Sequence, residues 1–418
     1  MLPSTSTRTS PVATYDSVRA CLVVFSGYRS GTALNDVEGL SFGATPTWAP
    51  IAPSGALPGP RAGACAISDL PRDRMIVFAG ATTVNHSTVW YNDVWEFQWT
   101  GEPTWTRLFP TGTLPAGREN AAAVYDSRRE RMIVFGGSTS SGYKNDVWVL
   151  TLAAGTPAWT QVTVAGTPPT ARSGAVAIYD RARDRVVLFG GFDASFNRRN
   201  DVWALSLAGT PTWSPLTPAG SVPEARHTAS AIYDVVRDRM ILYAGFGESP
   251  FYYKDDVWEL AFSPSLAWSQ LAPAGAIPPG RNNHVAVYDG ARDRMLVYGG
   301  SGSAGQLGDA WELVWGTALD VADTAEPEAL LAWSAPNPAP HDPIIEFRLP
   351  AAGPAAVTIY DAAGRRIRTL ANGWFLAGTH SARWDRTTDR GDRARAGIYF
   401  YEVRARGPHI VQKLILLN

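Results

Sequence analysis

Short apolar runs separated by polar turns recur along the first three quarters of the chain, and residues 118–162 contain a clear copy of the pattern. There an apolar run over 121–125 ends in an aspartate, a polar turn follows, and the β-branched and aromatic run 132–135 stops at two glycines. Residues 146–152 then alternate between apolar and polar positions, and a fourth short run begins at Trp159. Alternation over such short runs is typical of strands. Each copy therefore predicts four antiparallel strands and no helix.

The copies form a tandem array with a period of 53–57 residues, measured between the aspartates of an Asn-Asp-Val-Trp element. Those aspartates are Asp36, Asp93, Asp146, Asp201, Asp256 and Asp309. A lone four-stranded sheet cannot bury both of its faces, so neighbouring units must pack face to face. About fifty residues per four-stranded unit is the spacing of a propeller blade. The predicted fold is all-β, with a six-bladed β-propeller over residues 1–315.

Three features of each unit resemble the kelch repeat over residues 8–315: an arginine before the first strand, a Gly-Gly that ends the second, and a tryptophan in the fourth. The arginines, each thirteen residues after a tryptophan, are Arg61, Arg118, Arg172, Arg226 and Arg281. One departure is an Asp-Val-Trp in the third strand, where many kelch units carry tyrosine. The resemblance implies a kelch-type propeller of bacterial type.

Residues that recur in every unit are interpreted as scaffold. The arginine series is expected to tie adjacent blades together through planar, multi-donor hydrogen bonds. The Asn-Asp turns and the Asp-x-x-Arg hairpins are expected to bond the local backbone, and the third-strand tryptophans to belong to the core. The turn aspartates in this class include Asp93, Asp146, Asp201 and Asp256.

A second pattern follows an acidic linker predicted over residues 316–335. It carries Pro-Asn-Pro at 336–338, Ile-Tyr-Asp at 359–361 with Gly-Arg at 364–365, and Gly-Ile-Tyr-Phe at 397–400. Alternating strands over 336–418 predict a small immunoglobulin-like β-sandwich. The motifs resemble the C-terminal sorting domain of the type IX secretion system and its relative in flagellar hook-capping proteins. That resemblance implies export, a secreted or cell-surface location, and secretion machinery as a partner of this domain.

The start of the sequence carries a further expectation. Arg8 is in register with the later arginines, but its tryptophan would lie five residues before Met1. We therefore expect the sequence to be a piece of a longer one, with three good strands in the sixth blade and 318–321 as a makeshift fourth. No secretory signal pattern precedes the first blade, which argues against export unless residues are missing upstream.

Composition narrows the function classes. A net charge of −1 offers no field for nucleic acid, and no stretch approaches the ~20 apolar residues of a membrane helix. The two cysteines, Cys21 and Cys65, are expected to be free thiols rather than a bridge. We expect a monomer.

Function is predicted where the repeat breaks, in two sets of loops that open on one face of the propeller. The residues after the arginines supply Glu119, Asn120, His227, Asn283 and His284, and the loops between second and third strands supply Trp90, Tyr91, Phe251, Tyr252 and Tyr253. Aromatic faces beside amides and charges predict a surface for a carbohydrate or protein ligand. The alternative is solvated loops with incidental aromatics.

Other chemistry finds little support in the sequence. The run 300–305 fits a dinucleotide fingerprint, but no helix follows it. His227 and His284 lack a third ligand at metal spacing, so neither a metal nor a cofactor is expected. The cysteine–tyrosine pair of kelch-type copper radical oxidases has no counterpart here. We expect an exported, non-catalytic binding protein; the alternative is a carbohydrate-active kelch enzyme, mutarotase-like or oxidase-like.

Overall fold

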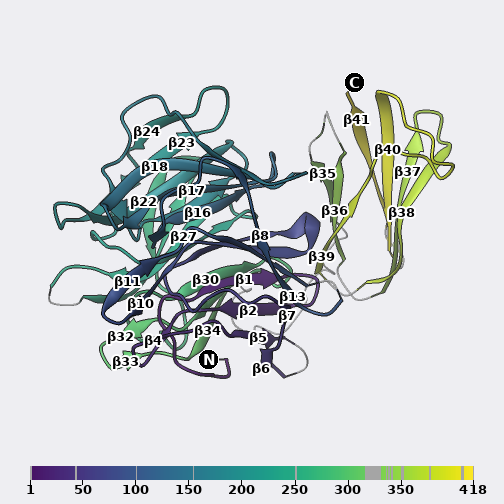
Figure 1. Ribbon diagram of the computed structural model, residues 1–418. Helices are drawn as coiled ribbons and strands as arrows, with labels where there is room; N and C mark the ends of the chain where they lie inside the picture. Colours follow the sequence, from purple (N-terminus) through teal and green to yellow (C-terminus); the bar gives the residue numbers. More distant parts are fainter. Residues whose placement is uncertain are drawn as a thin grey trace. The chain divides into compact units, whose positions relative to one another are not determined.

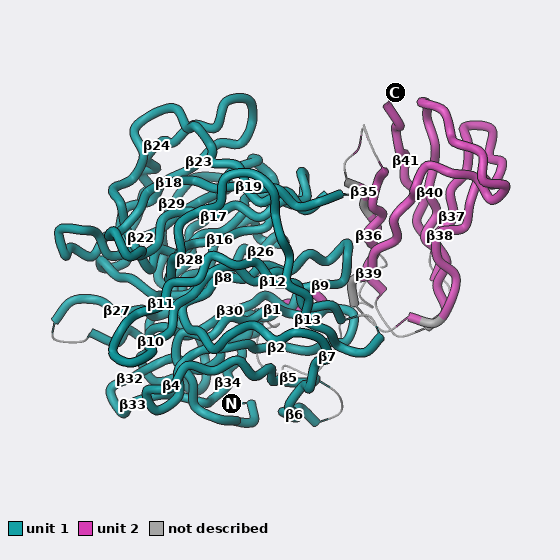
Figure 2. Tube along the Cα trace, viewed as in Figure 1, with its two compact units in different colours: residues 1–289, 294–315 teal, residues 290–293, 316–418 magenta. Residues whose placement is uncertain are grey.

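The computed structural model describes residues 2–42, 45–99, 101–153, 155–249, 252–315, 331–335, 337, 339, 342–349, 353–375, 378–405 and 409–417. Strands dominate this part of the chain, and the one helical element in it is a short 3-10 turn, Leu70–Arg72. The chain divides into two compact units, residues 1–289 with 294–315 and residues 290–293 with 316–418 (Figure 2). The all-β class predicted from the sequence is confirmed.

Unit 1 consists of a succession of antiparallel sheets whose strands follow one another in chain order. The first sheet is β1 (Val12–Asp16), β2 (Cys21–Phe25), β5 (Val37–Ser41) and β6 (Thr47–Ile51). The second is β8 (Cys65–Asp69), β9 (Arg74–Phe78), β12 (Val94–Gln98) and β13 (Thr104–Leu108), and the third is β16 (Ala122–Asp126), β17 (Arg131–Thr139), β18 (Gly142–Thr151) and β19 (Ala158–Gln161).

The later sheets repeat the plan. The fourth is β21 (Val176–Asp180), β22 (Arg185–Asp193), β23 (Arg198–Ser206) and β24 (Thr212–Leu216), and the fifth is β26 (Ser230–Asp234), β27 (Arg239–Phe246), β28 (Tyr253–Ala261) and β29 (Ala267–Leu271). The sixth has three strands among the described residues, β30 (Val285–Asp289), β31 (Arg294–Tyr298) and β34 (Ala310–Val314). Hairpin tips and connectors supply β3 (Tyr28–Arg29), β4 (Thr32–Ala33), β10 (Ala81–Val84), β11 (Ser87–Trp90), β32 (Ser301–Gly302), β33 (Gly305–Gln306), β7 (Ser54–Gly55), β14 (Thr111–Gly112), β15 (Arg118–Glu119), β20 (Arg172–Ser173) and β25 (Ala219–Gly220).

The sheets close into a ring. Their innermost strands contact one another in the order β1, β8, β16, β21, β26 and β30, and β30 contacts β1 again. Figure 1 shows β1, β8, β16 and β30 toward the middle of unit 1, with β6 and β24 at its periphery. Six sheets therefore surround one axis in the described part of the chain, as a propeller requires, while six blades in the whole protein stays a prediction.

Among the described residues, aromatic pairs join neighbouring sheets at five of the six junctions of the ring. In each pair an aromatic residue of a second strand packs on the fourth-strand tryptophan of the following sheet, with ring centroids 4.7–5.3 Å apart. The pairs are Phe25–Trp105, Phe78–Trp159, Phe135–Trp213, Phe189–Trp268 and, across the closure of the ring, Tyr298–Trp48. Burying such large side chains supplies much of the stability of the ring, at roughly 25 cal/mol per Å² of apolar surface removed from water.

The repeated arginines form buried clamps, of which Arg118 is typical. Its guanidinium donates to both carboxylate oxygens of Asp146, at 2.8 and 3.0 Å, and to the Gly136 carbonyl at 2.7 Å. The indole of Trp148 donates to the same carboxylate at 2.6 Å. Arg61, Arg172, Arg226 and Arg281 repeat the arrangement with Asp93, Asp201, Asp256 and Asp309.

The clamps correct one expectation and refine another. The guanidinium of Arg118 binds its own sheet, and the contact with the preceding sheet comes from its backbone, whose carbonyl accepts from Gly80 and whose N–H donates to Tyr91. The asparagine of each Asn-Asp pair does not bond its local turn: Asn145 donates to the Pro169 carbonyl at 3.2 Å. A side chain pointing away from a tight turn reaches the next connector instead, and thereby fixes that connector's path.

The connectors also cover the outer edges of the sheets. β7 pairs in parallel with β13, β14 with β19, Ala165 with Thr212, and β25 with β29. Each connector thus adds two residues or fewer outside the fourth strand of the sheet that follows it, which shields an exposed edge. The glycines Gly55, Gly112, Gly166 and Gly220 sit at these contacts with φ of 76–87°. A Cβ at any of them would collide with a tryptophan carbonyl oxygen, so glycine is required there.

The beginning of the chain takes part in the closure. Leu2 bridges Ala310 of β34. The residue equivalent to Ala310 in the second sheet is Val94, which pairs with Leu108 of the fourth strand. Leu2 therefore takes the place of a fourth-strand residue in the sixth sheet. Arg8 donates its N–H to Leu307 and its guanidinium to Asp36. The expected makeshift strand at 318–321 lies outside the described residues.

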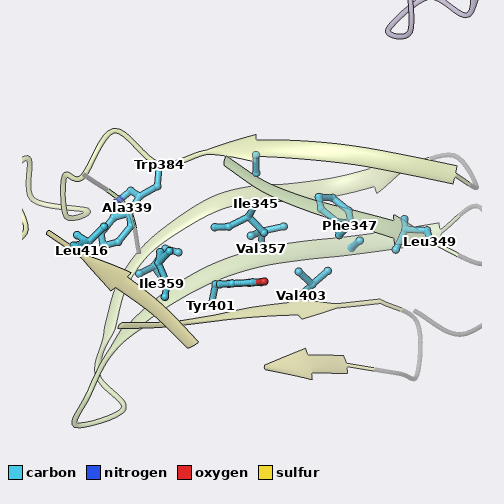
Figure 3. Close-up of a cluster of buried hydrophobic side chains, with 13 residues drawn as sticks. Ala339, Ile345, Phe347, Leu349, Val357, Ile359, Trp384, Tyr401, Val403 and Leu416 are labelled. Atoms are coloured by element: carbon cyan, nitrogen blue, oxygen red, sulfur yellow. The ribbon is translucent and has the colours of Figure 1, made fainter. Parts of the chain in front are cut away.

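Unit 2 is a small two-sheet sandwich. One sheet is β35 (Leu331–Ala335), β36 (Ile344–Leu349) and β39 (Gly378–Arg383), and the other is β38 (Arg366–Phe375), β37 (Gly353–Asp361), β40 (Gly397–Arg404) and β41 (His409–Leu416). Figure 3 shows side chains such as Ile345, Val357 and Tyr401 pointing toward one another in its core. The predicted linker reached residue 335, but 331–335 forms β35, because this segment pairs with β36 along its whole length.

Candidate functional site

A polar cavity of about 180 Å³ lies at the mouth of the central channel of unit 1. It is lined by the second and third residues after each clamp arginine, so every sheet contributes one pair. The lining residues are Ser10, Pro11, Gly63, Ala64, Asn120, Ala121, Gly174, Ala175, Thr228, Ala229, Asn283 and His284. The first residue of each pair is called here a ring residue: Ser10, Gly63, Asn120, Gly174, Thr228 and Asn283.

The ring residues are joined by a closed circle of backbone hydrogen bonds. Each donates its N–H to the carbonyl of the ring residue in the preceding sheet, over 2.7–3.0 Å, and Ser10 donates to Asn283 to complete the circle. The circle fixes six backbone segments at one level of the channel. It therefore forms a rigid collar from which the side chains of these residues extend.

All six ring residues have a left-handed backbone, with φ between 50 and 65°. Glycine adopts this conformation freely, asparagine tolerates it, and other residues are disfavoured there by about 1 kcal/mol. Two of the six, Gly63 and Gly174, are glycine. The serine and especially the β-branched threonine are exceptions for which backbone geometry gives no reason.

The ionisable groups around the cavity are mostly uncharged or paired. Burial lowers the pKa of His284 to about 3, so this imidazole is neutral near pH 7, and its Nε2 lies 2.7 Å from the Ser230 hydroxyl. Burial also raises the pKa of Glu119, which is half-buried beside Asn120. The clamp aspartate Asp146 is held ionised by its arginine. Burial alone would raise the pKa of Asp146, but hydrogen bonds from Arg118 outweigh it and the pKa is lowered.

An aromatic cluster lies beside the ring. It is built from the facing ends of second and third strands, from the loops between them, and from His227, which follows the clamp arginine Arg226. Phe192 lies 5.2 Å from the His227 ring, His227 lies 5.5 Å from Phe246, and Phe246 stacks on Tyr252 at 5.3 Å with an interplanar angle of 12°. The cluster also contains Tyr143, Phe196, Arg198 and Tyr253. It thus spans loops of the third, fourth and fifth sheets.

Part of the cluster is open to solvent. The exposed fraction is 77% for Phe196 and 44% for Tyr252. The Arg198 guanidinium lies over the rings of Phe192 and Phe246, at 5.7 and 5.1 Å, and pairs with Glu248. Burial, with the charge of Arg198, lowers the pKa of His227 to about 4. Near neutral pH this surface is therefore aromatic, with a neutral imidazole at its centre.

The structure separates the predicted site residues into groups. Asn120, Asn283 and His284 line the cavity, with Glu119 beside it, whereas His227, Tyr252 and Tyr253 belong to the aromatic cluster. Phe251 lies outside the described residues. A ligand role for any of these residues stays a prediction.

Trp90 and Tyr91 are not brought into the cluster by any contact of the described residues. Tyr91 lies under the guanidinium of Arg61, 4.2 Å from Cζ to the ring centroid, and its hydroxyl faces Gly59. Trp90 ends β11 and pairs with Ala81. These contacts give Tyr91 a structural role in the second sheet.

The sequence predicted function in the loops between second and third strands, but the residues chosen there did not include Tyr143, Phe192, Phe196 or Phe246. A signal was available: the residue after the Gly-Gly position is aromatic in the fourth and fifth units, Phe192 and Phe246, and serine in the third. Paired strand ends bring these positions together across neighbouring sheets, and the order of residues along the chain does not show this contact.

The two cysteines are free, and neither belongs to the site. Burial raises the pKa of both the Cys21 and the Cys65 thiol to about 12. Because the thiolate is the reactive form, both thiols are inert near neutral pH. No candidate membrane-spanning helix occurs in the part of the chain that the structure describes.

Family models match both units. The KLHDC2/KLHL20/DRC7 Kelch-repeats domain matches residues 92–300 and 183–344, which together span more than half of the chain. The FlgD Ig-like domain matches residues 344–408.

Curated relatives match over about half of this chain. A leucine-zipper-like transcriptional regulator 1 homolog of Drosophila melanogaster is 28% identical over 247 residues, 55% of this chain and 23% of its own length. A putative adagio-like protein 2 of Oryza sativa subsp. japonica is 29% identical over 49% of this chain and 31% of its own. The serine/threonine-protein phosphatase BSL2 of Arabidopsis thaliana is 31% identical over 49% of this chain and 19% of its own. The match thus covers less than a third of the length of each of these relatives.

Among solved structures, that of YjhT superposes with a TM-score of 0.57 and 18% identity, over 74% of this chain and 95% of the other. At this identity the likeness concerns the fold alone.

Proposed function

This chain belongs to the kelch-repeat family, and we propose that it is a non-catalytic binding protein that holds a protein or carbohydrate ligand on the face formed by its irregular loops. A kelch-repeat region together with an immunoglobulin-like domain is consistent with an interaction module. The observation that carries the proposal is the aromatic cluster around His227. Three sheets contribute to it, its members are in mutual contact, and two of its aromatic rings are open to solvent.

Physical chemistry favours binding at such a surface. Rigid aromatic side chains offer large contact areas at a small cost in conformational entropy, and they recur among the residues that dominate binding energies. The packed rings of Phe192 and Phe246 hold Tyr252 and Phe196 in place before a ligand arrives. A preorganised surface of this kind loses little freedom on binding.

Export is proposed for the C-terminal unit. Its similarity to the FlgD Ig-like domain and the motifs at 336–338 and 397–400 support a role in secretion or surface attachment, which would place the protein outside the cell. The test is to express the full chain and a form ending at residue 315, each behind the same signal peptide, in a bacterium that has a type IX secretion system. Recovery of both forms in the medium to the same extent would contradict this role.

The binding proposal is tested with the full chain immobilised as bait. Phe196→Ala and Tyr252→Ala should each weaken capture of a partner or glycan by about 1–3 kcal/mol, which is roughly 5-fold to 150-fold, because each removes an exposed ring from the cluster. Phe109→Ala is the matched control, since Phe109 is 74% exposed but lies outside the cluster. Equal retention by all four proteins would move the site off this surface.

A further inference from the structure

We propose that the ring residues at the channel mouth form a subsite for an uncharged, hydroxyl-rich end group, such as the terminal sugar of a neutral glycan. The proposal deepens the binding function proposed above and rests on it. The glycan would seat its end group in the cavity and extend over the aromatic cluster.

The first argument compares six positions with one backbone conformation. Gly63 and Gly174 show that glycine fits the circle of hydrogen bonds without any side chain. Ser10 and Thr228 carry side chains in the same left-handed conformation, which glycine would adopt at lower free energy. A residue that is unfavourable for the backbone is explained when its side chain serves another purpose, and the side chains here line a cavity.

The second argument is the hydrogen-bonding capacity left over. The circle uses the N–H and C=O groups of the ring residues, but the side chains of Ser10, Asn120 and Asn283 make no hydrogen bond with the described residues. Hydroxyls and amides both donate and accept. A ligand hydroxyl, which also does both, is their natural complement.

The third argument is charge. The arginines that encircle the mouth are already bound to aspartates, as Arg118 is to Asp146 and Arg281 to Asp309. The Glu119 carboxylate, half-buried beside Asn120, accepts no hydrogen bond from the residues the structure describes. An anionic end group would find a carboxylate and no free guanidinium, whereas a hydroxyl could donate to Glu119. Charge therefore disfavours a carboxylate, sulfate or phosphate terminus.

The fourth argument is size and continuity. At about 180 Å³ the cavity is smaller than the ~300 Å³ at which sites for drug-sized ligands begin, so it suits one ring-sized group rather than a whole ligand. Thr228 of the ring directly follows His227 of the cluster, and its hydroxyl lies 3.3 Å from His227 Nδ1. A chain leaving the cavity past Thr228 would meet aromatic faces, on which sugar rings stack readily.

The test uses the full chain on an array of oligosaccharides with neutral termini (glucose, mannose, galactose, N-acetylglucosamine) and with acidic termini (sialic and uronic acids). We expect the chain to bind at least one oligosaccharide with a neutral terminus. We expect it to bind no oligosaccharide with an acidic terminus more strongly. Asn120→Gly and Thr228→Gly should each weaken that binding at least tenfold while leaving the melting temperature unchanged or higher. Asn85→Gly is the matched control: Asn85 has φ of 49° in an exposed turn away from the ring, so the same change should not affect binding.

Four results would overturn the proposal. Three of them are a preference for acidic termini, binding that survives both ring substitutions, and a clear fall in melting temperature in the ring variants, which would make these side chains structural. The fourth is the absence of all glycan binding. In that case protein capture that still depends on Phe196 and Tyr252 would leave the proposed function standing.

Discussion

Two series of arginines recur around the propeller, one in the buried clamps and one in the hairpins between first and second strands. Clamp arginines such as Arg118 have side chains that are 0–1% exposed, whereas hairpin arginines such as Arg129 are 27–41% exposed. Both series pair with carboxylates at hydrogen-bond distance. Their surroundings differ, and this difference sets what each pair contributes.

A clamp joins elements of one sheet. Arg118 reaches the middle of β18 through Asp146 and the bulge in the middle of β17 through the Gly136 carbonyl, and Trp148 completes the group. The arginine and the aspartate of a clamp are both largely buried, so nearly every N–H of the guanidinium needs a hydrogen-bond acceptor within the protein. The repeated geometry of the clamps supplies these acceptors. Removing one partner would leave the other buried without compensation.

A hairpin pair joins neighbouring sheets. Arg129 binds Asp126 in its own turn and Asp184 in the next sheet, and Arg183 repeats this with Asp180 and Asp238. Water competes for these groups and salt screens them. The comparison teaches that a residue repeated at a fixed period has a structural role. The period does not indicate how much the residue's ion pair contributes to stability, because that contribution depends on burial.

The largest effect is expected from Arg118→Met. The change leaves the Asp146 carboxylate partly buried without its partner, and should destabilise unit 1 by about 3–5 kcal/mol. Urea unfolding followed by tryptophan fluorescence measures it.

A double variant, Arg118→Met with Asp146→Leu, is the control for that prediction. It removes both charges, so it should be more stable than the single variant. A single variant within about 1 kcal/mol of the wild type would show that the clamps are no stronger than exposed pairs.

Protonating a clamp aspartate in acid should have the next largest effect on the stability of unit 1. The loss per clamp should be smaller than for Arg118→Met, because a protonated aspartate is neutral and still forms hydrogen bonds with the arginine. The folded pKa of Asp146 is lowered, so its contribution is present above the unfolded pKa of about 3.9 and is lost as pH falls through the folded value. Between pH 5 and 3 the wild type should therefore lose more stability than Asp146→Asn. Parallel curves for the two proteins would contradict the prediction.

The histidines set a separate acid window. The folded pKa of His284 is lowered to about 3, so the unfolded chain takes up a proton first and stability falls as pH drops below about 6.5. His284→Gln should flatten the loss between pH 6.5 and 4 in thermal melts. A wild-type melting temperature that is constant over this range would refute it.

The smallest effect is expected from Arg129→Ala, which breaks an exposed pair. The loss should be about 1 kcal/mol or less, and it should shrink further in 1 M NaCl. The same urea titrations at low and high salt check it. A loss as large as that of Arg118→Met would erase the distinction between the two series.

Much of the fold followed from the sequence because its spacings are rigid. The alternation at 146–152 lies in β18 as far as Thr151, although the strand already begins at Gly142. The Gly-Gly after Phe135 forms a bulge between β17 and β18, and the fourth-strand Trp159 is buried in the core. Other contacts could not be predicted. The Asn145 side chain reaches Pro169 in the next connector, and such a contact depends on how sheets pack rather than on local pattern.

The candidate site was harder to predict than the fold. Two residues predicted from the sequence, Tyr252 and His227, both lie in the aromatic cluster, whereas a third, Tyr91, packs under Arg61. A ligand role for each of them stays a prediction. Loop length does not reveal which rings meet in space. The circle of hydrogen bonds was also invisible, because a left-handed serine or threonine leaves no mark in a sequence.

The connectors that cover the outer strands have a consequence for how the chain is made. β14 precedes β19, the strand it shields, by nearly fifty residues, and β7 and β25 precede their partners similarly. At about 5–20 residues per second on a ribosome, a cover emerges some seconds before the edge it protects. Each nascent outer strand can therefore be shielded as it leaves the ribosome, which limits the time during which two growing chains could join edge to edge.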